Sequence, residues 1–110
     1  MRQPDTLDRE RWQSVRRERI SALMDRVETE LFRAMDLHRK RINSPHEGYA
    51  VILEELNEVW ELVREKRPME HSLALEKELV QVAAMACRTI IDLELDAEVG
   101  PASSRERGER

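Results

Sequence analysis

Three glutamates interrupt an apolar segment that otherwise has the composition of a packing helix. The segment reads AVILEELNEVWELV, and EELNE occupies residues 54–58. At about 100° per residue, two of these glutamates fall in the middle of a stripe that begins and ends with apolar side chains; the stripe is Val51, Glu55, Glu58 and Leu62. Carboxylates that share a partly dry groove repel each other, at a cost on the order of several kcal/mol, unless a cation or a base is present. The pattern places Glu55 and Glu58 in a groove and Glu54 at its edge. Whether a cation lies beside the two carboxylates in the groove is the question that decides the function.

A second polar stripe is predicted on the helix that follows. It faces one direction of a helix whose other directions, from Leu79 through Ile91, are mostly apolar; its residues are Ala74, Glu78, Gln81, Met85, Arg88 and Asp92. Such a stripe is either the one solvated face of that helix or one wall of an internal polar site. Glutamates at this spacing are common on solvated faces, so EELNE alone indicates little. Two such elements on adjacent antiparallel helices favour a hard divalent ion such as Mg²⁺ or Mn²⁺, with Arg88 as a partial alternative source of positive charge.

The two acidic elements together carry a resemblance to a known family. EELNE at 54–58 is followed, after a spacer, by ELVQ at 78–81. This arrangement resembles the all-α nucleoside triphosphate pyrophosphohydrolases of the MazG type, whose pattern is EExxE, a variable spacer and ExxD. The resemblance spans about residues 44–93, where SPHEGYAVILEELNEVW and ELVQVAAMACR are similar to the small stand-alone members of bacteria and phages. Some of those members act on purine deoxynucleotides.

The resemblance implies a set of metal ligands. By position, Glu55, Glu58 and Glu78 would coordinate Mg²⁺ or Mn²⁺, and they are the residues that the stripes single out as well. Gln81 stands where the family has an aspartate, which is a departure from the pattern. A neutral amide offers one carbonyl oxygen in place of a charged carboxylate, so either the metal is bound less tightly or in another arrangement, or Gln81 contacts the ligand instead. Asp92 is too far along the helix to replace the missing carboxylate simply.

The resemblance also implies the reaction, which is that of a nucleotide diphosphatase, a hydrolase acting on acid anhydrides. Such enzymes cleave between the α- and β-phosphates to give a monophosphate and pyrophosphate, and metal ions activate the attacking water. Glu54, beside the ligands, is the candidate to orient or deprotonate that water. Lys66 and Arg88 are candidates to meet the phosphates, although for Lys66 the sequence favours solvation at a helix end.

The opening of the second helix offers a candidate pocket for the base. His46 and Tyr49 follow Pro45 directly, within the SPHEG string that carries the resemblance. One interpretation makes them capping and packing residues. The other makes them part of a base pocket, with Tyr49 stacking on the base. The sequence leaves both interpretations open.

Three long helices are predicted to position these residues. They should run from about Thr6 to Lys40, from about Pro45 to Glu65, with Ser44 as its N-cap, and from about Glu70 to Asp96. On the second helix, a stripe of apolar residues is the predicted packing seam; it consists of Ile52, Leu56, Val59 and Val63. We expect a single all-α domain over residues 1–97, a helical bundle, followed by a disordered tail over residues 98–110.

The apolar surface predicted on these helices exceeds what one chain can cover. The third helix is apolar in several directions, and only two other helices are available to cover it. We therefore expect a homo-oligomer, a dimer or a tetramer, with the third helix in its interface.

Charge and composition exclude several other classes of function. A net charge of -4 argues against binding to a nucleic acid polymer. Cys87 is the only cysteine, so neither a disulfide framework nor a cysteine-rich metal site is available. No window holds the roughly 18 uncharged apolar residues of a membrane span, and the N-terminus lacks a signal-peptide core. We expect a cytoplasmic protein without a membrane partner.

A second class of function remains open. The chain could be a non-catalytic helical dimerisation module, or a degenerate family member that binds a nucleotide without cleaving it. Gln81 is the residue that best supports this alternative. Pyrophosphate release from a panel of nucleoside triphosphates in the presence of a divalent ion distinguishes the two.

Overall fold

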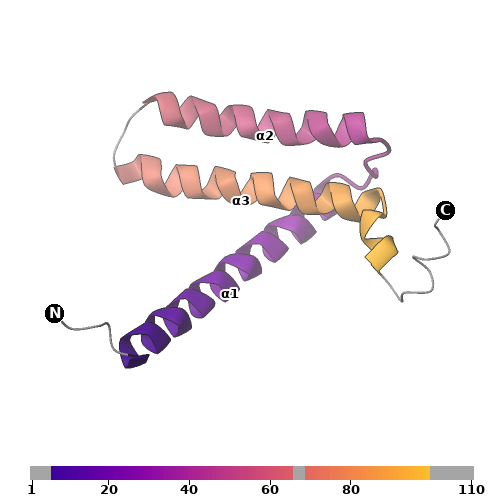
Figure 1. Ribbon diagram of the computed structural model, residues 1–110. Helices are drawn as coiled ribbons and strands as arrows, with labels where there is room; N and C mark the ends of the chain where they lie inside the picture. The colour runs from indigo at the N-terminus through magenta and orange to yellow at the C-terminus, as the bar shows by residue number, and fades with distance from the viewer. Residues whose placement is uncertain (1–5, 66–68, 100–110) are drawn as a thin grey trace.

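The computed structural model describes residues 6–65 and 69–99, and within these ranges it contains helices and no strand. The long helices are α1 (Thr6–Leu37), α2 (Pro45–Glu65) and α3 (Met69–Asp92), and a short 3₁₀ helix, η1 (Leu95–Val99), follows. α2 and α3 lie side by side and antiparallel, while α1 crosses them at an angle and its N-terminal half projects away (Figure 1). The prediction of an all-α chain with three long helices is confirmed.

α2 has the bounds that the sequence predicted, and its first turn shows why. The Ser44 hydroxyl accepts a hydrogen bond from the Glu47 backbone N–H at 3.1 Å, and the Glu47 carboxylate accepts one from the Asn43 N–H at 2.8 Å. Pro45 stands at the first helical position, where the missing N–H leaves no bond unmade. This N-cap fixes where α2 begins, and therefore which of its residues lie opposite α3.

α1 ends at Leu37, three residues before the predicted end at Lys40. The reason is a contact from a distant part of the chain. The Arg88 guanidinium, on α3, donates hydrogen bonds to the carbonyl oxygens of His38 and Lys40, the latter at 2.8 Å. These carbonyls thereby gain a partner outside the helix, and the chain turns so that the Ile42 side chain is buried.

α3 also ends early, at Asp92 and not at the predicted Asp96. The Asp92 carboxylate accepts a hydrogen bond from the Ile42 N–H at 2.9 Å, and the Asp92 carbonyl oxygen accepts one from the Arg41 guanidinium. Glu94 then takes a left-handed conformation, with φ of 60°, which turns the chain out of the helix. The connection between α1 and α2 thus caps the C-terminus of α3.

The predicted C-terminal tail, residues 98–110, starts inside η1. This helix extends to Val99, so helical structure continues two residues past the predicted boundary. Residues 100–110 lie outside the described residues, as do residues 66–68 between α2 and α3.

The core is small and is built around one face of α3. Ala84 is fully buried and Met85 nearly so, and they pack against Val27 and Ala34 of α1. Partly buried residues surround this cluster; they are Leu31, Val51, Ile52, Val80, Ala83 and Cys87. Arg88 is buried on the same face, which decides between the alternatives left open by the sequence: the polar stripe of α3 faces inward and is not the solvated face of that helix.

The predicted packing seam of α2 is only partly covered within the chain. Leu56 and Val63 are 46% and 44% exposed, so the seam prediction is wrong for these two residues in a single chain. Val51, from the neighbouring stripe that contains Glu55, packs against the core, as does Ile52 of the predicted seam. The radius of gyration is 18.8 Å, whereas a compact chain of this length has about 13 Å. No helix within the described ranges combines the length and apolar character needed to cross a bilayer.

A glycine allows α2 to approach α3 closely near the start of α2. Gly48 is buried, and a Cβ atom at this position would lie 2.5 Å from Thr89 Cγ2, a contact that side chains do not make. The Thr89 hydroxyl donates to the Met85 carbonyl oxygen at 2.9 Å, so this side chain is held in place. The two helices therefore approach each other closely near the end of the pair where Arg88 and Asp92 lie.

Removing the buried guanidinium should destabilise the fold. In Arg88→Met, the Asp92 carboxylate keeps the Ile42 N–H but loses its cation, and the carbonyls of His38 and Lys40 lose their donors. We expect the free energy of unfolding to fall by about 3–5 kcal/mol, the usual effect of breaking a buried ion pair. Urea denaturation followed by circular dichroism measures it.

Arg64→Met is the matched control for this prediction. Arg64 pairs with Glu61 at 2.9 Å, but both side chains are more than half exposed. Its loss should change the free energy of unfolding by less than about 1 kcal/mol. Equal effects of the two substitutions would show that the buried network does not hold the helices together.

Candidate metal centre

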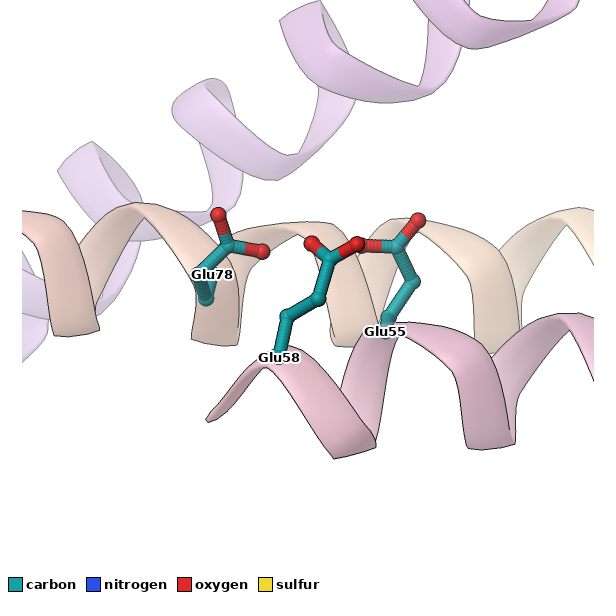
Figure 2. Close-up of side chains that lie close together, drawn as sticks. All are labelled: Glu55, Glu58 and Glu78. Carbon is teal, nitrogen blue, oxygen red and sulfur yellow. The ribbon is translucent and has the colours of Figure 1, made fainter. Parts of the chain in front are cut away.

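Three carboxylates from two helices meet in one place and are called here the carboxylate cluster. Glu55 and Glu58 come from α2 and Glu78 from α3, and one oxygen of each lies within 4.8 Å of the others. Figure 2 shows the three side chains in a row, with Glu58 between Glu78 and Glu55. The structure thus brings together the three residues that the sequence singled out as metal ligands.

Burial and mutual repulsion raise the pKa of two members of the carboxylate cluster. Partial burial is the main cause for Glu55, and the negative charges of Glu58, Glu54 and Glu30 add to it. The pKa of Glu78 is raised to about 7, first by burial, then by a hydrogen bond with Glu58 and by the charges of Glu58 and Glu55. Without a cation, Glu78 therefore holds a proton for much of the time at neutral pH.

Gln81 joins the carboxylate cluster as a hydrogen-bond donor. With its amide oriented to suit its neighbours, the nitrogen donates to Glu55 Oε1 at 2.8 Å and to Glu78 Oε1 at 3.2 Å. A carboxylate at this position would add a fourth negative charge and could not donate while ionised. Gln81 thus partly offsets the repulsion between Glu55 and Glu78.

Two residues of α1 complete the surroundings, and the sequence pattern did not single them out. Glu30 and Arg33 form a bidentate ion pair, with Arg33 Nε 3.1 Å from Glu30 Oε1 and Nη2 2.6 Å from Oε2. Glu30 lies near enough to raise the pKa of Glu55, and Arg33 lowers it. In the sequence, the feature that points to these two residues is their position next to Leu31 and Ala34, which pack into the core. How α1 crosses the other helices cannot be read from the periodicity of α1.

A cleft of about 310 Å³ lies next to Glu55. Its walls come from α2, α3 and the connection between α1 and α2; they are His38, Lys40, Ile42, Glu47, Val51, Glu54, Glu55, Met85 and Arg88. Glu54 is exposed at this cleft, beside the carboxylate cluster. Because the cleft combines carboxylates with the basic side chain of Lys40, it suits a ligand that carries both a cation and an anion.

Of the other residues predicted to contact the ligand, Arg88 lines the cleft, whereas His46 and Tyr49 do not. Arg88 lines the cleft but is only 6% exposed, and its guanidinium bonds to Asp92 and to two carbonyl oxygens. His46 and Tyr49 are exposed on the first turns of α2 and do not form walls of the cleft. Lys66 lies outside the described residues.

The donor set of the carboxylate cluster fits a hard divalent ion. All three converging groups are carboxylates, which supply oxygen ligands. Mg²⁺ and Mn²⁺ prefer oxygen ligands and retain bound water, so a partly exposed cluster of this kind suits them. Glu58 is exposed, which leaves a route for the ion and for a ligand bound to it.

No family model matches the chain, and comparisons with curated proteins and with solved structures found no match. An assignment of function therefore depends on the geometry of the carboxylate cluster and on the motifs that EELNE and ELVQ form.

Metal-free protein should lose stability as the pH rises. The pKa of Glu78 is about 7 in the folded protein and 4.5 for an isolated glutamate side chain, so the folded state binds this proton more tightly. The stability that this proton contributes to the folded state is fully present below pH 4.5 and is lost as the pH rises through 7. We expect the melting temperature in EDTA to fall by several degrees over this range, and saturating Mn²⁺ to restore most of it at the high end.

Two variants test whether the carboxylate cluster causes this dependence. Glu78→Gln removes the titrating group and should flatten the pH profile, whereas Glu61→Gln, on the exposed side of α2, should keep the wild-type slope. A profile that is the same in wild type and Glu78→Gln, with no response to Mn²⁺, would mean that the three glutamates do not act as one charged cluster.

Proposed function

We propose that the protein is a metal-dependent nucleoside triphosphate pyrophosphohydrolase, which converts a nucleoside triphosphate to the monophosphate and pyrophosphate. The observation that carries the proposal is the convergence of Glu55, Glu58 and Glu78, from two helices, with one oxygen of each within 4.8 Å. The resemblance of EELNE and ELVQ to the MazG-type pattern supports it. Purine deoxynucleoside triphosphates are the first substrates to test.

The residues of the chain would divide between metal binding and proton transfer. Glu55, Glu58 and Glu78 would hold Mg²⁺ or Mn²⁺, which neutralises phosphate oxygens and makes a bound water more acidic. Water attack on phosphorus breaks the anhydride bond between the α- and β-phosphates, and the water proton passes to a nearby base. Glu54 suits this role because it is exposed at the cleft beside the carboxylate cluster. No nucleophilic side chain is needed.

A non-catalytic nucleotide-binding protein is the second candidate, and one observation favours it. The Gln81 amide bonds to two of the three carboxylates and so stabilises them without a metal. A carboxylate at this position would strengthen metal binding instead. A panel of nucleoside triphosphates with Mn²⁺ separates the candidates, because an enzyme releases pyrophosphate and a degenerate member binds without release.

Replacing one member of the carboxylate cluster should separate activity from stability. Glu58→Gln keeps the size and helix propensity of the side chain but removes the charge that a divalent ion requires. Pyrophosphate release should fall by about 10²–10³-fold, as expected when the stabilisation of transition-state charge is lost. Metal-free stability should stay equal or increase, because one source of repulsion toward Glu55 and Glu78 is gone.

Glu61→Gln is the control for that experiment. Glu61 lies on α2, one turn beyond Glu58, and it pairs with Arg64 on the exposed side of the helix. It should change neither pyrophosphate release nor the free energy of unfolding by a measurable amount. Equal activity in the two variants would show that EELNE is an ordinary solvated helix face and that the proposed function is wrong.

We further propose that the protein works as a homodimer. Large apolar side chains remain exposed on all three helices, including Trp12 at 52% and Trp60 at 58%. The N-terminal half of α1 has no helix beside it in the described chain, and a single helix of this kind is marginal in water without tertiary packing (Figure 1). A second copy would offer the same apolar faces in return, as a two-fold interface requires.

Sedimentation at micromolar concentration tests this assembly. We expect a particle of twice the 13.0 kDa chain mass. Leu56→Glu places a charge in the exposed stripe of α2 and should shift the equilibrium toward monomer, whereas Glu61→Gln should leave the mass unchanged. A wild-type chain that stays monomeric and fully folded would contradict the proposed dimer.

A further inference from the structure

The Arg33 guanidinium is held beside the carboxylate cluster by a partner that is itself mostly buried. Glu30 is 17% exposed and Arg33 is 54% exposed. Both contacts of this pair are hydrogen bonds between charged groups, Nε to Oε1 at 3.1 Å and Nη2 to Oε2 at 2.6 Å. Such a two-point contact fixes the plane of the guanidinium as well as its position. Arg33 is therefore oriented before any ligand arrives.

Arg33 also has N–H donors that Glu30 does not use. A guanidinium carries five N–H donors, and the two contacts with Glu30 use two of them. Within the described part of the chain, Nη1 of Arg33 makes no hydrogen bond. Leu31, next to Glu30 on α1, packs against the same core as Val51, which lies one turn before Glu55 on α2. The hydrogen bonds and charge of Glu30, and to a smaller extent the charge of Glu55, raise the pKa of Arg33. An exposed, oriented cation with free donors thus lies next to a predicted metal ligand.

The ion pair between Arg33 and Glu30 differs from an ordinary surface pair. Arg64 and Glu61 have the same spacing on α2, but both are more than half exposed and a single hydrogen bond joins them. In the Arg33 pair the acid is mostly buried and the contact is bidentate. Surface pairs of the first kind contribute little to stability, so the tighter arrangement beside Glu55 calls for another role.

An anion that approaches the carboxylate cluster needs a cation of this kind. A triphosphate is repelled by three glutamates, and a single divalent ion offsets only part of that charge. Arg88 is poorly placed to help, because it is buried and already bonds to Asp92 and to the carbonyls of His38 and Lys40. Arg33 has the exposure that Arg88 lacks.

We propose that Arg33 binds the phosphate groups of the nucleotide and that Glu30 is its positioning residue. The inference depends on the proposed function, since it assigns the phosphate-binding side of the same site. Guanidinium suits the task because its parallel N–H groups match two phosphate oxygens, which the point charge of a lysine cannot do. α1 thereby contributes to a site whose metal ligands come from α2 and α3.

Nucleotide binding without turnover tests the proposal. The probe is an α,β-methylene deoxynucleoside triphosphate, titrated calorimetrically into the protein with saturating Mn²⁺. We expect Kd to rise about 10–100-fold in Arg33→Gln, less in Arg33→Lys, and a few-fold in Glu30→Gln, where the arginine is kept but loses its fixed orientation. Arg64→Gln is the control and should bind as wild type does.

A second measurement separates phosphate binding from a structural role. The rise in melting temperature caused by Mn²⁺ alone reports the carboxylate cluster, and it should be unchanged or larger in Arg33→Gln because a competing cation is gone. Equal losses of the Mn²⁺ response and of nucleotide affinity would show that Arg33 organises the cluster and would overturn the proposal.

The result for wild type distinguishes the role of Arg33 from the proposed function. If wild type binds the analogue and Arg33→Gln binds it equally well, the role of Arg33 is wrong and the proposed function stands. If wild type neither binds the analogue nor releases pyrophosphate from any nucleoside triphosphate, both are wrong. For active protein, Arg33→Gln should raise KM more than it lowers kcat, because the phosphate contact is present in the bound substrate.

Discussion

The buried Arg88 guanidinium fixes how the three helices stand relative to one another. It bonds to Asp92 on its own helix and to the carbonyls of His38 and Lys40, while Asp92 takes the Ile42 N–H. The start of α2 is thereby anchored to the end of α3. Glu58 lies 13 residues after Pro45, and Glu78 lies 14 residues before Asp92. At 1.5 Å per residue, both are about 20 Å from the anchor. Because α2 and α3 are antiparallel and these two distances are nearly equal, Glu58 and Glu78 lie at the same height along the helix pair.

The inward face of α3 serves three purposes, and these conflict in part. Ala84 and Met85 form the core, Arg88 forms the anchor, and Glu78 and Gln81 form a wall of the carboxylate cluster. The apolar core and the anchor hold the helix pair together although its glutamates repel each other. The fold relieves that repulsion by local means. Glu78 binds a proton more readily than usual and Gln81 donates to two carboxylates, and a divalent ion would do the same more strongly.

Local signals predicted the elements, and long-range contacts explain the differences. The bounds of α2 follow from Ser44 and Pro45, which are adjacent in sequence to what they cap. α1 and α3 end earlier than their periodicity indicates, because Arg88 and Ile42 reach across from distant positions. The stripes on α2 and α3 predicted which glutamates meet, since an antiparallel pair follows from a short connection. Glu30 and Arg33 could not be found in this way, because their place depends on how α1 crosses the pair.

α1 connects the carboxylate cluster to the exposed apolar surface of the molecule. Its C-terminal half packs Val27 and Ala34 into the core and presents Glu30 and Arg33 beside Glu55, whereas its N-terminal half projects from the helix pair (Figure 1). A helix is stiff over this length, so its two halves cannot move independently. Contacts that hold the N-terminal half, such as those of a second copy, would also limit how far Arg33 can move from the carboxylates. Assembly and the electrostatics of the site would then be coupled through one helix, with no change needed in α2 or α3.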